Sequence, residues 1–592
     1  MADPRILTLS APRAAALAFL SRAAWLGQAF CVCVGALSAG PAFAAPGGEP
    51  EPELRRSDDV TGQGAVWFSH RGSFRFRSEY LLGGDLGGNG ASGVPTPLGA
   101  ETGVDPDANA LGWASVRLRY EPSIHVGPAL SVHLGLDALD NIIMGSTHEA
   151  AGGDLSLGLS GDGQASPSAG RNGWRDAVSI RQAYGRWLAF DALELTGGRM
   201  VDAFGLGLSR NAGDCEDCDF GTVVDRAALA LTISGFRIGA AWEFTAVGKT
   251  SDSIIEAERQ AGGQPKDLGT ADDVTTYVLE VGQYPVSEAE KAARAKLLDE
   301  DRGWAVDWSL FASFTDQTHS SLEPPVDNSV ECQPSDTLAD GSPVTTYACS
   351  RLVPRDAFFL RPGFWMKVEH RPGFDESLRL ELEVAGLIGD IAHPQRLFDD
   401  AVDDSKDFFG LGAAAELEWR RGRTTFGLDL GLATGDDGPF VGVLDGNNAV
   451  DPDDDGYLSN DPIRNNKTIT SYTFNRDYRV DLILFRQILG AVTNAAYFKP
   501  YVSHELLSTD SLTLSARLDV MYAAAMRPSG TPGNGDSWGL ELDGRLGLES
   551  RSGFSAALTL GLLLPMDALA DPITGETAEP VFGMRGLFGW RF

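Results

Sequence analysis

Two cysteines in an acidic stretch have the residue types and spacing that most strongly suggest chemistry. Cys215 and Cys218 stand three positions apart in N-A-G-D-C-E-D-C-D-F-G, residues 211–221. In an oxidising compartment such a pair forms a disulfide, which we expect to staple a tight external turn. A thioredoxin-like role needs a βαβ context, and zinc needs two further ligands that the nearby sequence lacks. A staple that also holds a divalent cation, and a catalytic role, are the alternative interpretations.

The other two cysteines downstream of the leader, and an aspartate-rich motif, fall in expected loops. Cys332 and Cys349 lie within one loop, and closing it is worth about 3 kcal/mol in a chain-entropy model. The motif D-P-D-D-D-G places Asp451, Asp453 and Asp455 at the spacing of the first half of a calcium-binding loop. Position twelve of that loop is proline rather than a bidentate acid, so an acidic, solvated loop is the alternative. Calcium is the one cofactor that the sequence suggests.

The basic residues are nearly all arginine, forty against eight lysines, and many fall on faces predicted to point inward. Rings of charged side chains on such faces set the ion selectivity of pores. Ordinary lumen polarity, in a GC-rich genome that favours arginine, is the alternative explanation. The residues that we expect to line a pore or its constriction are Arg75, Arg77, Arg117, Arg119, Arg379, Glu381, Arg479, Asp481, Arg486, Arg517 and Arg545.

The eight histidines give little sign of catalysis. His125, His133, His370 and His504 lie on or beside expected strands, without a recognisable Ser or Asp partner motif. Barrel enzymes assemble their sites across strands, so a barrel-embedded hydrolase stays as a third functional hypothesis. We do not expect an enzyme.

Strands of alternating polarity must position these side chains. In residues 512–520, Leu, Ala and Val alternate with Thr, Ser, Arg and Asp, and similar segments recur along the chain. Each is close to the ~9–11 residues of a tilted membrane-spanning strand. A period of two puts the apolar residues on one face and the charges on the other. The pattern predicts an all-β fold, a single transmembrane antiparallel barrel with a wet lumen.

The strand count depends on one segment. Counting every apolar segment gives nineteen strands and sends the last one in the wrong direction. In residues 478–493 the apolar positions cluster as in a short amphipathic helix, so we expect an internal plug and eighteen wall strands. Sixteen strands, and an ordinary wall strand at 478–493, are the alternatives. Short links alternate with long ones, which predicts short periplasmic turns and long external loops. One periplasmic link, residues 285–303, has the pattern of a helix.

The two ends of the chain indicate export. Arg5, Arg13 and Arg22 precede an apolar run and an Ala-Phe-Ala motif, which predicts a signal peptide over residues 1–44. A periplasmic leader, residues 45–60, then precedes the barrel, residues 61–592. The final strand V-F-G-M-R-G-L-F-G-W-R-F ends on Phe592, which resembles the signal that outer-membrane barrels present to their assembly machinery.

The net charge limits the kinds of binding partner that the sequence suggests. Removing the signal peptide, with one acid and three arginines, takes the charge from −34 to −36, which argues against nucleic acid. Outer-membrane lipid and lipopolysaccharide, bridged by divalent cations on surface acids, are the expected surroundings. Small solutes are the expected cargo.

Several stretches resemble an uncharacterised family of predicted outer-membrane proteins best represented in myxobacteria. The resemblance runs along most of the mature chain and implies location and barrel fold, without an activity or a substrate. Residues 201–204 read Val-Asp-Ala-Phe where relatives are expected to carry a His-Trp pair, so no role of that histidine is expected here. The matching stretches are F-R-F-R-S-E-Y-L (74–81), L-D-A-L-D-N-I-I-M-G-S-T (136–147), G-R-M-V-D-A-F-G-L-G (198–207), D-C-E-D-C-D-F-G-T-V-V-D-R (214–226) and Y-R-V-D-L-I-L-F-R-Q-I-L-G-A-V-T-N-A (478–495).

The sequence therefore predicts a porin-like channel for passive or weakly selective passage of small solutes. A closed barrel that acts through its acidic external loops, in surface interaction or envelope structure, is the alternative.

Overall fold

The computed structural model describes residues 66–84, 86, 110–143, 178–190, 192–233, 235–247, 270–322, 351–393, 405–436, 468–571 and 575–592. The expected signal peptide and leader (1–44 and 45–60), Cys332, Cys349 and the Asp451–Asp453–Asp455 motif lie outside these ranges. The barrel expected over residues 61–592 is represented from Val66 onward.

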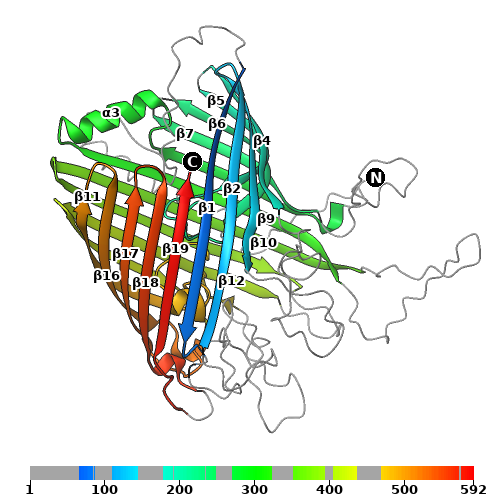
Figure 1. Ribbon diagram of the computed structural model, residues 1–592. Helices are drawn as coiled ribbons and strands as arrows, with labels where there is room; N and C mark the ends of the chain where they lie inside the picture. The colour runs from blue at the N-terminus through cyan, green and yellow to red at the C-terminus, as the bar shows by residue number, and fades with distance from the viewer. Residues whose placement is uncertain are drawn as a thin grey trace, which may run out of the picture.

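The described residues form one closed antiparallel sheet (Figure 1). Its strands are β1 Val66–Leu82, β2 Ala110–Val126, β3 Leu130–Ile143, β4 Val178–Ala189, β5 Leu193–Asp202, β6 Thr222–Ile233, β7 Phe236–Ala246, β8 Val274–Gln283, β9 Trp304–Leu322, β10 Arg351–Gly373, β11 Glu376–Ile391, β12 Lys406–Arg421, β13 Thr424–Ala433, β14 Thr468–Ile469, β15 Ala495–Ser508, β16 Leu512–Ala525, β17 Ser537–Ser550, β18 Phe554–Pro565 and β19 Val581–Arg591.

Eighteen of these nineteen strands form the wall. Each pairs with its neighbours in chain order, and β1 pairs with β19, which closes the barrel. The two-residue β14 instead runs parallel to one end of β12, and β13 pairs directly with β15. The prediction of eighteen wall strands, with residues 478–493 outside the wall, is therefore confirmed.

The helical elements in the described ranges are few and short. Helix α3, with a Ser287 capping box, joins β8 to β9 at the end of the barrel that carries the short turns, as the sequence predicted for residues 285–303 (Figure 1). No helix in this part of the chain is long and apolar enough to cross a membrane. The elements are α3 Glu288–Asp299, the 3-10 turns η4 Thr270–Asp272, η6 Pro528–Gly530 and η7 Asp567–Leu569, and the π-helix η5 Leu484–Ile488.

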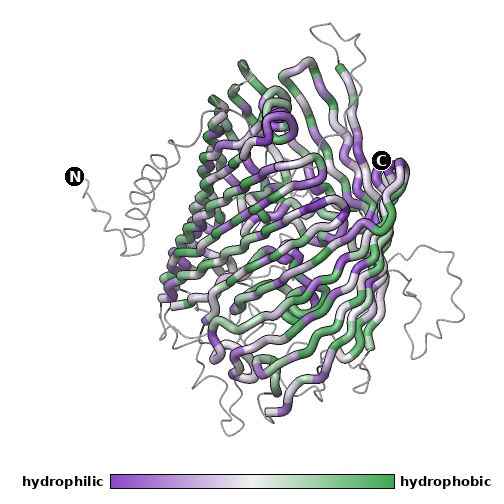
Figure 2. Tube along the Cα trace, turned by 90° about the vertical axis from the view of Figure 1, so that its left-hand side faces the viewer, coloured by the Kyte–Doolittle hydropathy of each residue, from purple (hydrophilic) through white to green (hydrophobic). Residues whose placement is uncertain are grey.

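The pleat of the strands separates apolar and charged side chains, as the alternating colours along the tube in Figure 2 show. On β19, Phe588 and Trp590 are exposed on the outer face, while Arg585 points inward to an ion pair. On β1, Arg75 and Arg77 are buried on the inner face, and Phe74 and Phe76 contact aromatic rings of β19 outside. Apolar side chains on one face and charges on the other are what the alternating pattern predicts for barrel strands.

One expected face is wrong. The sequence puts Trp538 on the same outer face as Leu540 and Leu546, but the indole is buried and donates a hydrogen bond to the Asn494 carbonyl at 2.9 Å. The register between β16 and β17 shifts at this point, beside Gly539 with φ +158°. A bulge adds one residue and moves the side chain to the other face of the strand.

A hydrophobic core lies inside the barrel rather than between layers. Ile483 and Leu484 of the internal segment are fully buried against Leu563 of β18 and Val581 of β19, among other wall residues. A smaller cluster joins Phe204 to residues of β8, β9 and β10. Parts of the lumen are therefore packed, and the remaining charged side chains are arranged around that packing.

Candidate functional site

The connection from β5 to β6 folds into the lumen, and we call residues 203–221 the inward loop. The predicted disulfide between Cys215 and Cys218 is present and closes a tight turn of this loop. Its predicted place on an external turn is wrong, because the turn contacts inward-facing side chains of β1, β2, β18 and β19. Inward arginines and loop carboxylates attract each other, and this attraction accounts for the inward path of the loop.

Arginines of the wall satisfy the backbone of the inward loop. Arg75 and Arg117 both donate hydrogen bonds to the Cys218 carbonyl, at 2.7 and 2.8 Å, and Arg119 donates to the Gly213 carbonyl at 2.9 Å. A loop without its own secondary structure leaves carbonyls that must find donors when they are buried. The five N–H groups of each guanidinium suit that task.

Two aspartates of the inward loop form ion pairs with further arginines. Asp217 lies 2.5 Å from Arg486 and from Arg585, and Asp219 lies 2.7 Å from both Arg77 and Arg479. Burial by itself would raise the pKa of Asp217, but the surrounding guanidiniums, Arg486 first, hold that pKa well below its ordinary value. Asp217 is therefore ionised wherever the loop is folded.

The inward loop is fastened to the segment that follows β14. The buried carboxylate of Asp477 accepts hydrogen bonds from three successive backbone amides, those of Asp219 at 2.7 Å, Phe220 at 2.8 Å and Gly221 at 2.5 Å. The amide of Asn475 donates to the Leu208 carbonyl at 2.7 Å. Successive amides that converge on one carboxylate form a strong, directional clamp.

Residues 478–493, which we call the plug segment, lie against the inner faces of β15 to β19. The carboxylate of Glu541 accepts hydrogen bonds from the amides of Leu482, Ile483 and Leu484 at 2.8 to 3.0 Å. The segment makes a single five-residue π-helix rather than the amphipathic helix that the sequence predicted. Its apolar side chains contact the core described above, and this packing outweighs helical propensity.

The three charged residues predicted on the plug segment have different partners. Arg479 and Arg486 bind the loop aspartates, whereas the Asp481 carboxylate accepts the amides of Phe485 at 2.7 Å and Arg486 at 3.2 Å. Burial raises the pKa of Asp481 to about 6. Two of these residues therefore hold the loop, and the third holds the π-helical turn.

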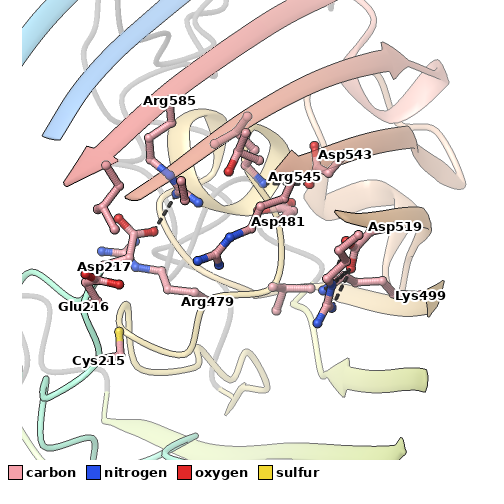
Figure 3. A pocket seen from close by; sticks show the side chains of 16 residues that line it. Cys215, Glu216, Asp217, Arg479, Asp481, Lys499, Asp519, Asp543, Arg545 and Arg585 are labelled. Carbon is pink, nitrogen blue, oxygen red and sulfur yellow. Dashed lines mark hydrogen bonds and ion pairs between the residues drawn. The ribbon is translucent and has the colours of Figure 1, made fainter. Parts of the chain in front are cut away.

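A cavity of about 390 Å³ remains between the inward loop, the plug segment and the wall (Figure 3). Basic and acidic side chains share its lining, and Cys215 of the disulfide also borders it. Such a lining keeps the space hydrated and gives it a strong local field. Its charged residues are Glu216, Asp217, Arg479, Asp481, Lys499, Arg517, Asp519, Asp543, Arg545 and Arg585.

The structure brings some of the predicted pore residues to this cavity and leaves others apart. Arg517 lines it, with its guanidinium 2.6 Å from Asp519 and 3.6 Å from the centre of the Tyr501 ring. Arg545 lines it as well. Arg379 and Glu381, an ion pair on β11, do not line it, and Glu381 accepts a hydrogen bond from the Trp365 indole at 2.8 Å.

Sequence reasoning missed the partners of the arginines. Asp217 and Asp219 of the inward loop form ion pairs with Arg75 and Arg77 of β1 and with Arg585 of β19. The signal was present in the four acids around Cys215 and Cys218, which we assigned to the external surface. Among the described residues, no cluster of three or more His, Cys, Asp or Glu side chains could hold a metal ion.

A second polar cluster faces inward near the short-turn end of β1 to β4. The His133 ring nitrogens contact the Ser123 and Ser131 hydroxyls, both at 2.8 Å, and His125 contacts Ser69 at 3.0 Å. No motif in the sequence indicates these serine partners. A catalytic histidine uses one nitrogen for the nucleophile and the other for an orienting acid. Because serines contact both nitrogens of His133, its geometry differs from a catalytic triad.

Comparison with known proteins gives results only at the level of structure. No family model matches the sequence, and no curated protein matches it. The chain is similar to the crystal structure of Acinetobacter baumannii OccAB2, at 11% identity over 88% of this chain and 98% of that one, with a TM-score of 0.43. It is also similar to Pseudomonas aeruginosa OccK9 (OpdG), at 12% identity, 89% and 98% coverage and a TM-score of 0.42. A third similar structure is P. aeruginosa OpdK with vanillate, at 10% identity over 88% of this chain and 98% of that one, with a TM-score of 0.39.

Proposed function

We propose that this chain is an outer-membrane channel for small solutes, with a lumen narrowed by the inward loop and the plug segment. The wall supports this proposal. Exposed apolar side chains cover the outside of a closed barrel, and charged side chains line the inside, which is the division that a bilayer and an aqueous lumen require. The short turns gather at one end, which we assign to the periplasm.

The observation that carries the proposal is the charged cavity of about 390 Å³. A barrel with a purely structural role could fill this space with apolar side chains at lower cost, because buried ion pairs stabilise a fold weakly. Charges of both signs around a hydrated space instead suit the passage and selection of polar solutes.

A closed barrel that acts through its external loops is the second candidate. The apolar cluster around the plug segment favours it, because Ile483, Leu484 and Val492 are almost completely buried in it. A barrel sealed by this packing would conduct only after the segment moves.

The proposed channel also implies which lipids and proteins the barrel contacts in the outer membrane. We infer contact of the outer face with lipid and lipopolysaccharide, and recognition of the terminal strand by the barrel assembly machinery. Phe592 closes the β1–β19 seam by exchanging backbone hydrogen bonds with Gly72 at 2.7 and 3.0 Å, and its side chain is exposed. Calcium at Asp451, Asp453 and Asp455, the absence of catalysis and membership of the myxobacterial family are parts of the proposal that rest on sequence alone.

Current through refolded protein in a planar bilayer, under a salt gradient, tests the proposal. A steady open conductance is expected, and the sign of the reversal potential shows whether arginines or acids dominate the lumen. Silence from a folded, heat-modifiable barrel would overturn the channel and favour the structural barrel.

A further inference from the structure

The two sulfurs of the lumenal disulfide have different surroundings. Cys215 is exposed and borders the charged cavity, where its sulfur is drawn beside Glu216 and Asp217 (Figure 3). Cys218 is only 1% exposed, and its sulfur lies 3.8 Å from the Asp477 carbonyl. A small molecule in the cavity can therefore approach the Cys215 sulfur, whereas the Cys218 sulfur is buried beside Asp477.

The same disulfide holds the most heavily bonded turn of the inward loop. Within the turn, the Cys218 amide donates to the Cys215 carbonyl at 3.2 Å. The Cys218 carbonyl receives Arg75 and Arg117, and Asp217 meets Arg486 and Arg585. The bond between the sulfurs thus fixes the positions at which wall, loop and plug segment are connected.

We propose that Cys215 is a site of thiol–disulfide exchange with small thiols that enter the lumen, and that the exchange loosens the inward loop. Reactive disulfides are accessible at one sulfur, and positive charge near a leaving thiolate favours cleavage. Cys215 meets the first condition because it borders the cavity, and Arg75 and Arg117 bring positive charge to the backbone carbonyl of Cys218, the leaving residue. The ligand class is a low-molecular-weight thiol, and a protein oxidoreductase is too large for the cavity.

The exchange is balanced with two equivalents of thiol. A thiolate attacks the Cys215 sulfur, a new S–S bond forms to the small molecule, and the Cys215–Cys218 bond breaks. The electron pair of the broken bond leaves on Cys218, which takes a proton from water. A second thiolate then attacks the small-molecule sulfur of the mixed disulfide, releasing the Cys215 thiolate and a small disulfide. The protein gains two electrons, and two thiols are oxidised.

Opening the disulfide removes the constraint that keeps Asp217 between Arg486 and Arg585. The turn then samples more conformations, and the cavity joins more often with the rest of the lumen. We expect reduced protein to carry a higher open conductance than oxidised protein, with a reversal potential shifted toward anion selectivity. This conductance readout rests on the proposed channel function, whereas the exchange itself does not.

Labelling tests the chemistry independently of conduction. Folded protein is treated with dithiothreitol, alkylated with iodoacetamide without unfolding, and digested with trypsin to give the peptide of residues 211–226. We expect the alkylation mass on Cys215 only after dithiothreitol, and none on a matched variant, Cys215→Ser with Cys218→Ser. A peptide that keeps its disulfide under these conditions would overturn the proposal.

The same treatment in a planar bilayer tests the consequence. Dithiothreitol should raise the conductance of the wild-type barrel. The double serine variant should already have the conductance of the reduced wild type, and dithiothreitol should not change it. If the barrel conducts and Cys215 is alkylated after reduction, but the current does not change, the proposal that reduction loosens the inward loop is wrong. If the double variant fails to fold, reduction and reoxidation of the wild type give the same comparison.

Discussion

The carboxylate of Asp217 and the guanidinium of Arg585 meet at 2.5 Å, which joins the disulfide turn of the inward loop to the last wall strand. The pair is enclosed by Arg77 and Arg486, so one carboxylate holds three guanidiniums in place. Removing it should leave Arg486 and Arg585 without the carboxylate nearest to each guanidinium.

Asp217→Asn is therefore expected to destabilise the docked loop by about 3 kcal/mol, the usual cost of breaking a buried ion pair from one side. Thermal unfolding of the purified barrel, or protease cleavage within residues 203–221, measures the loss. Asp225→Asn is the matched control, because Asp225 pairs with Arg199 at 2.7 Å in a half-exposed bridge. That change should cost less than about 1 kcal/mol. Equal losses of stability in the two variants would contradict the conclusion that the ion pairs of Asp217 hold the inward loop in place.

Glycines on the last two strands make room for the plug segment. A Cβ at Gly583 would lie 3.0 Å from Ile483, and one at Gly561 would lie 2.9 Å from Leu482 and 2.6 Å from Asp543. Gly583→Val should displace the segment at a cost of about 1–3 kcal/mol and raise the conductance. Gly544→Val is the control, because nothing lies within 4 Å of the added Cβ. An unchanged current in both variants would argue against a plug that limits flow.

The pH dependence of the plug segment follows from Asp481. Burial raises its pKa to about 6, from an ordinary value of 3.8, in a site that Lys499, Glu541 and Asp543 share. A carboxyl with a raised pKa stabilises the docked state below about 3.8 and loses that contribution as the pH rises through about 6. Docking should thus be tighter at pH 5 than at pH 7.5.

Hydrogen exchange of the amides in residues 482–486, corrected for the intrinsic rate, measures this effect. Protection should be higher at the lower pH, and Asp481→Asn should reduce the difference without abolishing it, because neighbouring acids titrate too. Protection that increases with pH would contradict the stabilisation of the docked plug segment by protonated Asp481.

Helix α3 is fastened by a buried arginine. Arg294 binds Asp307 at 2.6 Å and also pairs with Glu369, and both Arg294 and Asp307 are buried. Arg294→Ala should detach the helix at a cost of about 3–5 kcal/mol, because Asp307 is left buried without its charge partner. Protease cleavage within residues 284–303 reports detachment. Lys296→Ala, at an exposed position, should change stability by less than about 0.5 kcal/mol.

Periodicity predicted the wall because a pleated strand gives each side chain one of two faces. The inward positions of Arg75, Arg117 and Arg585 follow from that rule alone. The rule failed at Trp538, where a bulge next to Gly539 adds one residue to the strand. Bulges leave no period in the sequence, so this position could not be predicted.

The path of the inward loop could not be predicted for a different reason. Its position depends on contacts between residues far apart in the chain, such as Asp477 with the amides of residues 219–221. The sequence shows the acids and the arginines but not which of them meet. Loop length together with a surplus of buried arginines is the signal that could have suggested an inward path.

The most direct test of the central claim compares two currents. Wild-type protein and a variant with residues 478–493 replaced by a short Gly-Ser linker are refolded, checked for heat-modifiability and inserted into planar bilayers. If the plug segment narrows a hydrated channel, both conduct, and the variant has the larger single-channel conductance. If neither conducts although both are folded, the lumen is not a path for solutes and the channel is ruled out.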